Sequence, residues 1–152
     1  MKPMETQKQI ESDLKEAMRA NDDLRKRTLR LVLSAIKLVE IDDGKPLVEG
    51  DVLSIIQKEI KSRRESIADA ERADRPDLVK VSESEIDILK TYLPQALTQE
   101  EIETMANAAI AEVGATSPKE MGQVMKVLMP RVQGRADGSA VSQTVRQLLA
   151  GD

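Results

Sequence analysis

Apolar side chains recur every three or four residues along almost the whole chain, which is the spacing of one face of an α-helix. Before Pro94 the pattern predicts four helices, at about residues 10–18, 24–39, 51–73 and 76–93. After Pro94 it predicts three shorter helices, at about residues 98–113, 117–132 and from 137 or 139 to 149. No segment reads as a strand, so we predict an all-α fold.

A boundary between two groups of helices is predicted at Pro94, because proline disfavours helix at the residue before it. Thr98 and Glu101 then have the spacing of a capping box at a helix start. Ser117 and Glu120 repeat that spacing ahead of the next helix. We therefore expect an N-terminal helical domain over residues 1–94 and a three-helix tail domain over residues 95–152.

Two helices of the first group have unusual patterns. In residues 24–39, Leu29, Leu33 and Leu38 widen the apolar arc, so this helix is expected to be the most buried one. The helix after Asp51 is apolar in its first half and almost wholly charged in its second. That charged half has little to bury, so we expect it to project from the body or to contact a protein partner, from Lys58 to Arg72.

The composition argues against independent catalysis. The chain has no Cys and no His, which excludes thiol nucleophiles, Ser-His arrangements and zinc sites built on those ligands. Its seven glycines form neither a dinucleotide nor a phosphate-binding fingerprint. Tyr92 is the only aromatic residue, so base-stacking platforms are excluded as well. We assign no catalytic residue, no metal site and no cofactor.

The charge distribution is uneven. The net charge is −4, yet from Lys119 onward five Lys or Arg residues face three acids. The predicted nucleic-acid-binding residues lie in this basic stretch: Lys126, Arg131, Gly134, Arg135 and Arg146. Helix geometry alone does not place Lys126, Arg131 and Arg135 on one stripe, so they converge only if Pro130 ends or kinks the helix. A tight helix connection capped by Asp137, with solvated surface cations, explains the same residues.

Two further basic groups lie in the first half of the chain. One is the run Arg25, Lys26, Arg27 and Arg30, and the other comprises Lys58, Lys61, Arg63 and Arg64. Either group could contact a polyanion. A solvated helix face with local salt bridges is the simpler explanation for each of them.

The segment from Met121 to Lys126, the loop from Gly134 to Gly138 and the ending Leu148-Leu149 resemble the C-terminal unit of the YqeY-like family. That unit is shared with the tail of the B subunit of the bacterial Asp/Glu-tRNA amidotransferase. Residues 61–66 and 85–94 resemble the N-terminal half of the same family. The resemblance implies an N-terminal helical domain followed by a tail that recognises tRNA by shape and backbone. Carried over by position, it points to Lys126, Gly134 and Arg135.

The leading hypothesis is therefore a non-catalytic module that binds tRNA or a tRNA-handling complex. The alternatives are a protein-interaction adaptor and a contributor to glutamine-dependent tRNA amidation, a carbon–nitrogen ligase reaction implied only by the family.

No apolar run approaches the ~20 residues of a membrane span, and the N-terminal stretch lacks the apolar core of a signal peptide. We therefore expect no membrane association and a cytoplasmic location.

Overall fold

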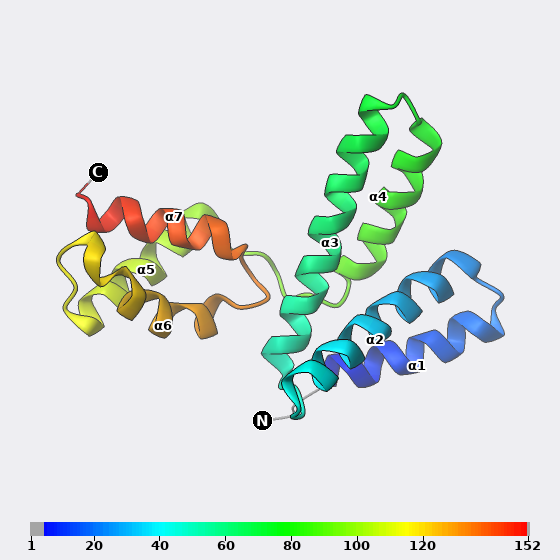
Figure 1. The fold of residues 1–152 in the computed structure, drawn as a ribbon, viewed down its shortest axis with the longest axis horizontal. Coiled ribbons are helices and arrows are strands. Elements are labelled where there is room, and N and C mark those ends of the chain that lie inside the picture. Colours follow the sequence, from blue (N-terminus) through cyan, green and yellow to red (C-terminus); the bar gives the residue numbers. More distant parts are fainter. Residues whose placement is uncertain (1–4, 152) are drawn as a thin grey trace. The chain divides into compact units, whose positions relative to one another are not determined.

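The computed structural model describes residues 5–151, which form helices throughout and contain no strand (Figure 1). Residues 1–4, where the N-terminal stretch begins, and residue 152 lie outside the described residues. The elements are α1 (Glu5–Arg19), α2 (Asp23–Asp43), α3 (Glu49–Arg72), α4 (Pro76–Lys90), α5 (Gln99–Val113), the short 3-10 helix η1 (Pro118–Glu120), α6 (Met121–Val132) and α7 (Gly138–Leu149). The all-α prediction is confirmed.

The chain divides into two compact units, one ending at Leu93 and the other beginning at Pro94. The first unit holds α1 to α4, and the second, here called the tail unit, holds α5 to α7. Each unit has its own aliphatic core, and the two cores have no residue in common.

Helix α2 is buried on one face only. Leu29, Val32 and Ile36 on that face are fully buried in the core of the first unit. Leu38, however, is 62% exposed, and α2 has four buried residues against six in α3, so the prediction that this is the most buried helix is wrong. The other helices of the unit pack against a single side of α2, and the widened arc extends beyond them. Met18 of α1 and Leu78 of α4 are also about half exposed.

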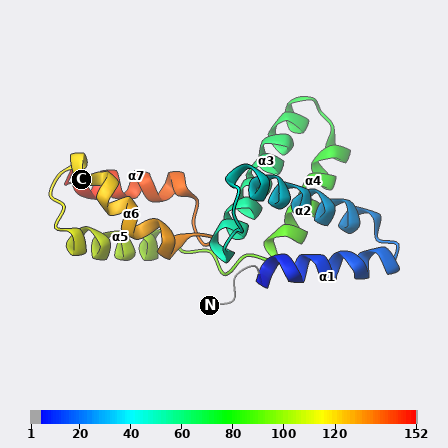
Figure 2. The same cartoon turned by 60° about the horizontal axis from the view of Figure 1, so that its bottom comes forward.

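Helices α3 and α4 lie side by side as an antiparallel hairpin (Figures 1 and 2). The hairpin buries part of the charged half of α3, which the sequence predicted to have little to bury. Arg63 is only 8% exposed, and Ala70, two helical turns further on, is 6% exposed. Pairing with α4 therefore continues past the apolar half of α3.

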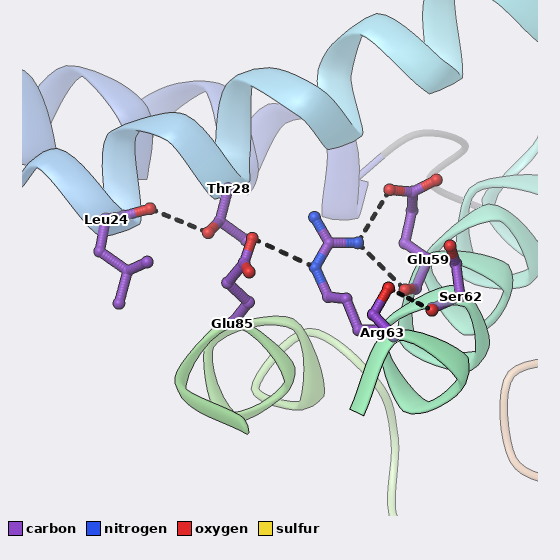
Figure 3. A network of polar contacts seen from close by, with 7 residues as sticks. Leu24, Thr28, Glu59, Ser62, Arg63 and Glu85 are labelled. Carbon is purple, nitrogen blue, oxygen red and sulfur yellow. Dashed lines mark hydrogen bonds and ion pairs between the residues drawn. The ribbon is translucent and has the colours of Figure 1, made fainter. Parts of the chain in front are cut away.

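The buried Arg63 guanidinium lies between acidic groups of two helices (Figure 3). Its Nη1 donates to the backbone oxygen of Glu59 and to Glu59 Oε1, both at 3.0 Å. Its Nε lies 3.4 Å from Glu85 Oε2 on α4, an ion pair without hydrogen-bond geometry. Removing one partner of such a pair leaves a buried charge unpaired, which is costly. Arg63 therefore ties α3 to α4 electrostatically.

Tyr92 closes the first unit. Its ring packs on the core of that unit, and its hydroxyl donates to Asp13 Oδ2 of α1 at 2.5 Å. Asp13 also lies 3.7 Å from Arg25 Nη2 of α2. Burial, and then the bond to the Asp13 carboxylate, raise the pKa of Tyr92 well above its ordinary value of 10.0. The segment after α4 is thereby fastened to α1 over 79 positions of sequence.

The tail unit is built from three amphipathic helices, α5, α6 and α7. The Thr98 hydroxyl accepts from the Glu101 N–H, and the Glu101 carboxylate accepts from the Thr98 N–H, each at 3.1 Å. This confirms the predicted capping box at the start of α5. The buried residues of the three helices recur at helical spacing, and they are Ile102, Ala106, Ala109, Val124, Leu128, Val132, Val141, Val145 and Leu149.

Replacing Arg63 by Met should destabilise the first unit by about 3 kcal/mol, because the Glu85 carboxylate, whose side chain is only 12% exposed, loses its partner. Urea unfolding followed by Tyr92 fluorescence measures this, since the chain's only aromatic residue belongs to that unit. Adding Glu85→Gln should recover about half of the loss. The neighbouring Arg64→Met, on an exposed residue, should change stability by less than about 0.5 kcal/mol. Equal effects of the two single variants would contradict the buried pair.

The Tyr92 hydroxyl should ionise at a higher pH in the folded protein than in denaturant. Because the folded state favours the protonated form, its contribution to stability is complete below pH 10 and is lost as the pH rises further. The near-ultraviolet absorbance of tyrosinate measures Tyr92 alone in this chain. Asp13→Asn should lower the native midpoint, since it removes the negative charge beside the hydroxyl. Identical midpoints for the folded and denatured chain would contradict the bond to Asp13.

Candidate nucleic-acid interface

The loop between α6 and α7 turns sharply at Gly134. This glycine is buried and has φ of +82°, a backbone conformation that side chains other than glycine rarely adopt. The N–H groups of Arg135 and Ala136 both donate to the Val132 oxygen, at 2.9 and 3.1 Å. Gly134 therefore has a structural reason to be glycine, whatever binds at the loop.

Arg135 fastens this loop to the beginning of the tail unit. Its Nε donates to the Gln95 oxygen at 3.1 Å, and its own backbone oxygen accepts from the Leu97 N–H at 2.8 Å. The Thr98 N–H and hydroxyl lower the pKa of Glu101, and the nearby Arg135 charge adds to that shift. Part of the Arg135 hydrogen-bonding capacity is thus used inside the protein.

The N-terminus of α7 is capped by a carboxylate. Asp137 accepts a hydrogen bond from the Ser139 N–H at 3.5 Å. An uncapped helix N-terminus beside basic residues could hold a phosphate. The negative Asp137 side chain lies at that end instead, and it satisfies one of the helix's unpaired donors.

Arg131 is paired with an acid of another helix. Its Nη1 and Nη2 donate to the two carboxylate oxygens of Glu112 on α5, at 2.5 and 3.0 Å. The hydrogen bonds of this pair raise the pKa of Arg131 and lower the pKa of Glu112. Both side chains are about half exposed, so the pair lies at the surface and adds little net positive charge there.

Lys126 does not share a face with Arg131. Helix α6 continues through Pro130 to Val132, so Arg131, five positions after Lys126, is rotated from it by about 140° around the axis. The sequence set as the condition for convergence a helix that ends or kinks at Pro130, and the helix does not end there. Lys126 instead points away from the core face formed by Val124 and Leu128.

Three cations of the tail unit are exposed and make no ion pair within the described part of the chain. Two of them, Lys126 on α6 and Arg146 on α7, were predicted binding residues. The third, Lys119 in η1, was not among the predicted binding residues. It precedes Lys126 by about two helical turns. Gly122 lies between them on α6, where an added Cβ would meet no atom within 4 Å. The backbone of α6 is therefore open to close approach at Gly122.

Two other features of residues 5–151 bear on what the protein contacts. No helix there is both long enough and apolar enough to cross a membrane. The same residues hold no group of three or more acidic side chains placed to share a metal ion.

Two helical units, each with its own aliphatic core, define a class of small, all-helical proteins, and comparison with known proteins identifies it. Residues 7–149 match the family described as Yqey-like protein. The chain belongs to this family, as its resemblance to YqeY-like proteins predicted.

Curated relatives in fungi are named Altered inheritance of mitochondria protein 41, mitochondrial. The one from Lachancea thermotolerans is 41% identical over 112 residues, which cover 72% of this chain and 60% of the relative. The one from Eremothecium gossypii is 37% identical over 150 residues, covering 93% of this chain and 79% of the relative. The match spans about 60% of the Lachancea thermotolerans and Kluyveromyces lactis proteins.

The expected cytoplasmic location is contradicted by these relatives. The matched proteins of Lachancea thermotolerans, Kluyveromyces lactis, Pyrenophora tritici-repentis and Eremothecium gossypii are all named as mitochondrial. The prediction was wrong because it rested only on the lack of a long apolar segment. That feature does not distinguish a cytoplasmic protein from a mitochondrial one.

Proposed function

We propose that this protein binds tRNA through the tail unit, as an accessory module without catalysis of its own. The observation that carries the proposal is the set of exposed, unpaired cations on that unit, Lys119, Lys126 and Arg146, in a chain of net charge −4. Cations that make no ion pair are available to neutralise phosphates and release counterions. The family's relation to the tRNA-amidotransferase tail supports RNA as the polyanion.

The outward face of α6 is the proposed centre of the contact. Lys126 supplies charge there, and Gly122 lets a sugar–phosphate backbone come close to the helix. Arg135 and Gly134 shape the loop that follows, so their contribution is mainly to hold its conformation. Arg131 contributes charge only when it leaves Glu112. Contacts of this kind recognise RNA shape and backbone rather than base sequence.

A protein partner on α3 is the second candidate. Lys58, Lys61 and Arg64 are exposed and make no ion pair within residues 5–151, which favours an acidic partner along the segment from Lys58 to Arg72. A contribution to glutamine-dependent amidation rests on the family relation alone, and no described contact favours it.

Reversing two tail cations, Lys126→Glu with Arg146→Glu, should weaken binding of labelled bulk tRNA at least about tenfold at low salt. The slope of log affinity against log salt should fall by about 2, because two phosphate contacts are lost. Fluorescence anisotropy with the full chain measures both. The matched control is Lys8→Glu with Lys15→Glu, two exposed, unpaired lysines of α1 that give the same change in net charge. Equal losses for the two double variants would show that binding is unspecific, and no saturable binding of the parent would reject the proposal.

Replacing Glu112 by Gln should strengthen tRNA binding by a few-fold, because it frees the Arg131 charge without altering the core. The salt slope should rise by about 1, as expected for one additional phosphate contact. Glu103→Gln, an exposed acid of α5 without a cationic partner, serves as the control for net charge. An identical gain in both variants would mean that Arg131 makes no specific contribution.

A further inference from the structure

Helix α2 has a second apolar line on its outward side. Leu31, Leu38 and Ile41 are 49%, 62% and 67% exposed, although other residues of the helix are fully buried. Single exposed leucines are ordinary on protein surfaces. Here, however, three of the large exposed side chains of the first unit share one helix, and their arrangement along it is regular.

The spacing is that of a helix-packing seam. Leu31, Ser34, Leu38 and Ile41 follow one another at intervals of three, four and three residues, which are the a and d positions of a heptad. Such residues form a continuous stripe along one side of a helix. Ser34 is small and exposed, so it leaves room for a side chain of a facing helix. The stripe is narrow, as expected for contact with one helix.

On one side of the seam, the charged residues directly beside Leu31 and Leu38 are basic. Arg30 and Lys37 precede Leu31 and Leu38 at equivalent heptad positions, and Arg27 continues the seam toward the start of α2. All three cations are exposed, and none makes a hydrogen bond or ion pair within residues 5–151. By contrast, Arg25 and Lys26, on the inward side of the same run, pair with Asp13 and Asp23.

We propose that the outward face of α2 binds an amphipathic helix of a partner protein, with apolar residues in its seam and acidic residues on the flank facing Arg30 and Lys37. Leu31, Leu38 and Ile41 supply the apolar contact, and the cations select an acidic partner. This surface lies outside the tail unit and is independent of tRNA binding. It also differs from the charged segment of α3.

Other occupants fit the same observations less well. A second copy placed antiparallel with its α2 on this α2 brings Arg30 and Lys37 toward like charges, which is unfavourable, and in a parallel copy Arg30 faces the uncharged Ala35. An anionic membrane surface favours a broad apolar face with basic residues on both flanks. This face has a narrow seam, and the flank opposite the cations carries Asp42.

The test uses a labelled peptide of about four heptads with Leu at a and d and Glu at e and g, and a matched peptide with Lys at e and g. Anisotropy titration with the full chain should show saturable binding of the Glu peptide, at least about tenfold tighter than the Lys peptide. Leu38→Gln with Ile41→Gln should weaken binding at least about tenfold. Arg30→Glu with Lys37→Glu should reverse the peptide preference.

The matched control is Leu78→Gln with Val81→Gln, which removes two exposed apolar side chains from α4 and should leave peptide binding unchanged. Circular dichroism checks that each variant keeps its helix content. The proposal is overturned if the seam variant binds as tightly as the parent or if both peptides bind equally. It is also overturned if light scattering shows a dimer that the seam variant loses, or if the seam drives binding to phosphatidylserine vesicles but not to the Glu peptide.

Discussion

Burial of aliphatic side chains in two separate cores is the interaction on which the rest of this structure depends. With one aromatic residue in the chain, each helix must supply an unbroken stripe of Leu, Ile, Val, Ala or Met to be held in place. The stripe fixes the rotation of the helix about its axis. The rotation of the helix in turn determines whether each polar side chain faces the core, lies beside it or points outward, before any specific polar contact forms.

The polar contacts then separate the cations into two groups. Arg63, Arg131 and Arg135 lie beside their stripes, where they meet groups from other segments and are tied to Glu85, Glu112 and the Gln95 oxygen. Lys126, Arg146 and the outward cations of α2 lie away from such partners. The first group serves the fold, and the second is available for partners outside the chain. This separation explains why the proposed RNA contact and the proposed helix contact both lie on outward faces.

Helix positions could be predicted from the sequence because periodicity and capping are local. The capping box of Thr98 and Glu101 needs only three residues, and it forms as predicted. Exposure of Leu38, burial of Arg63 and pairing of Arg131 with Glu112 could not be predicted in this way. Each depends on which neighbouring helix covers a face. Arg131 and Glu112, for example, are 19 residues apart in the sequence. Counting cations in one sequence segment cannot reveal that an acid of another helix already neutralises one of them.

The central claim is that the tail unit, through its unpaired cations, is the part of this protein that touches tRNA. The most direct measurement is ultraviolet cross-linking of bulk tRNA to the full chain at low salt, followed by mass spectrometry of the cross-linked peptides. Cross-links should fall in the tail unit, in peptides that contain Lys126 or Arg146, and should disappear at high salt. Cross-links confined to residues before Pro94, or none above the level of an unrelated acidic protein, would contradict the claim.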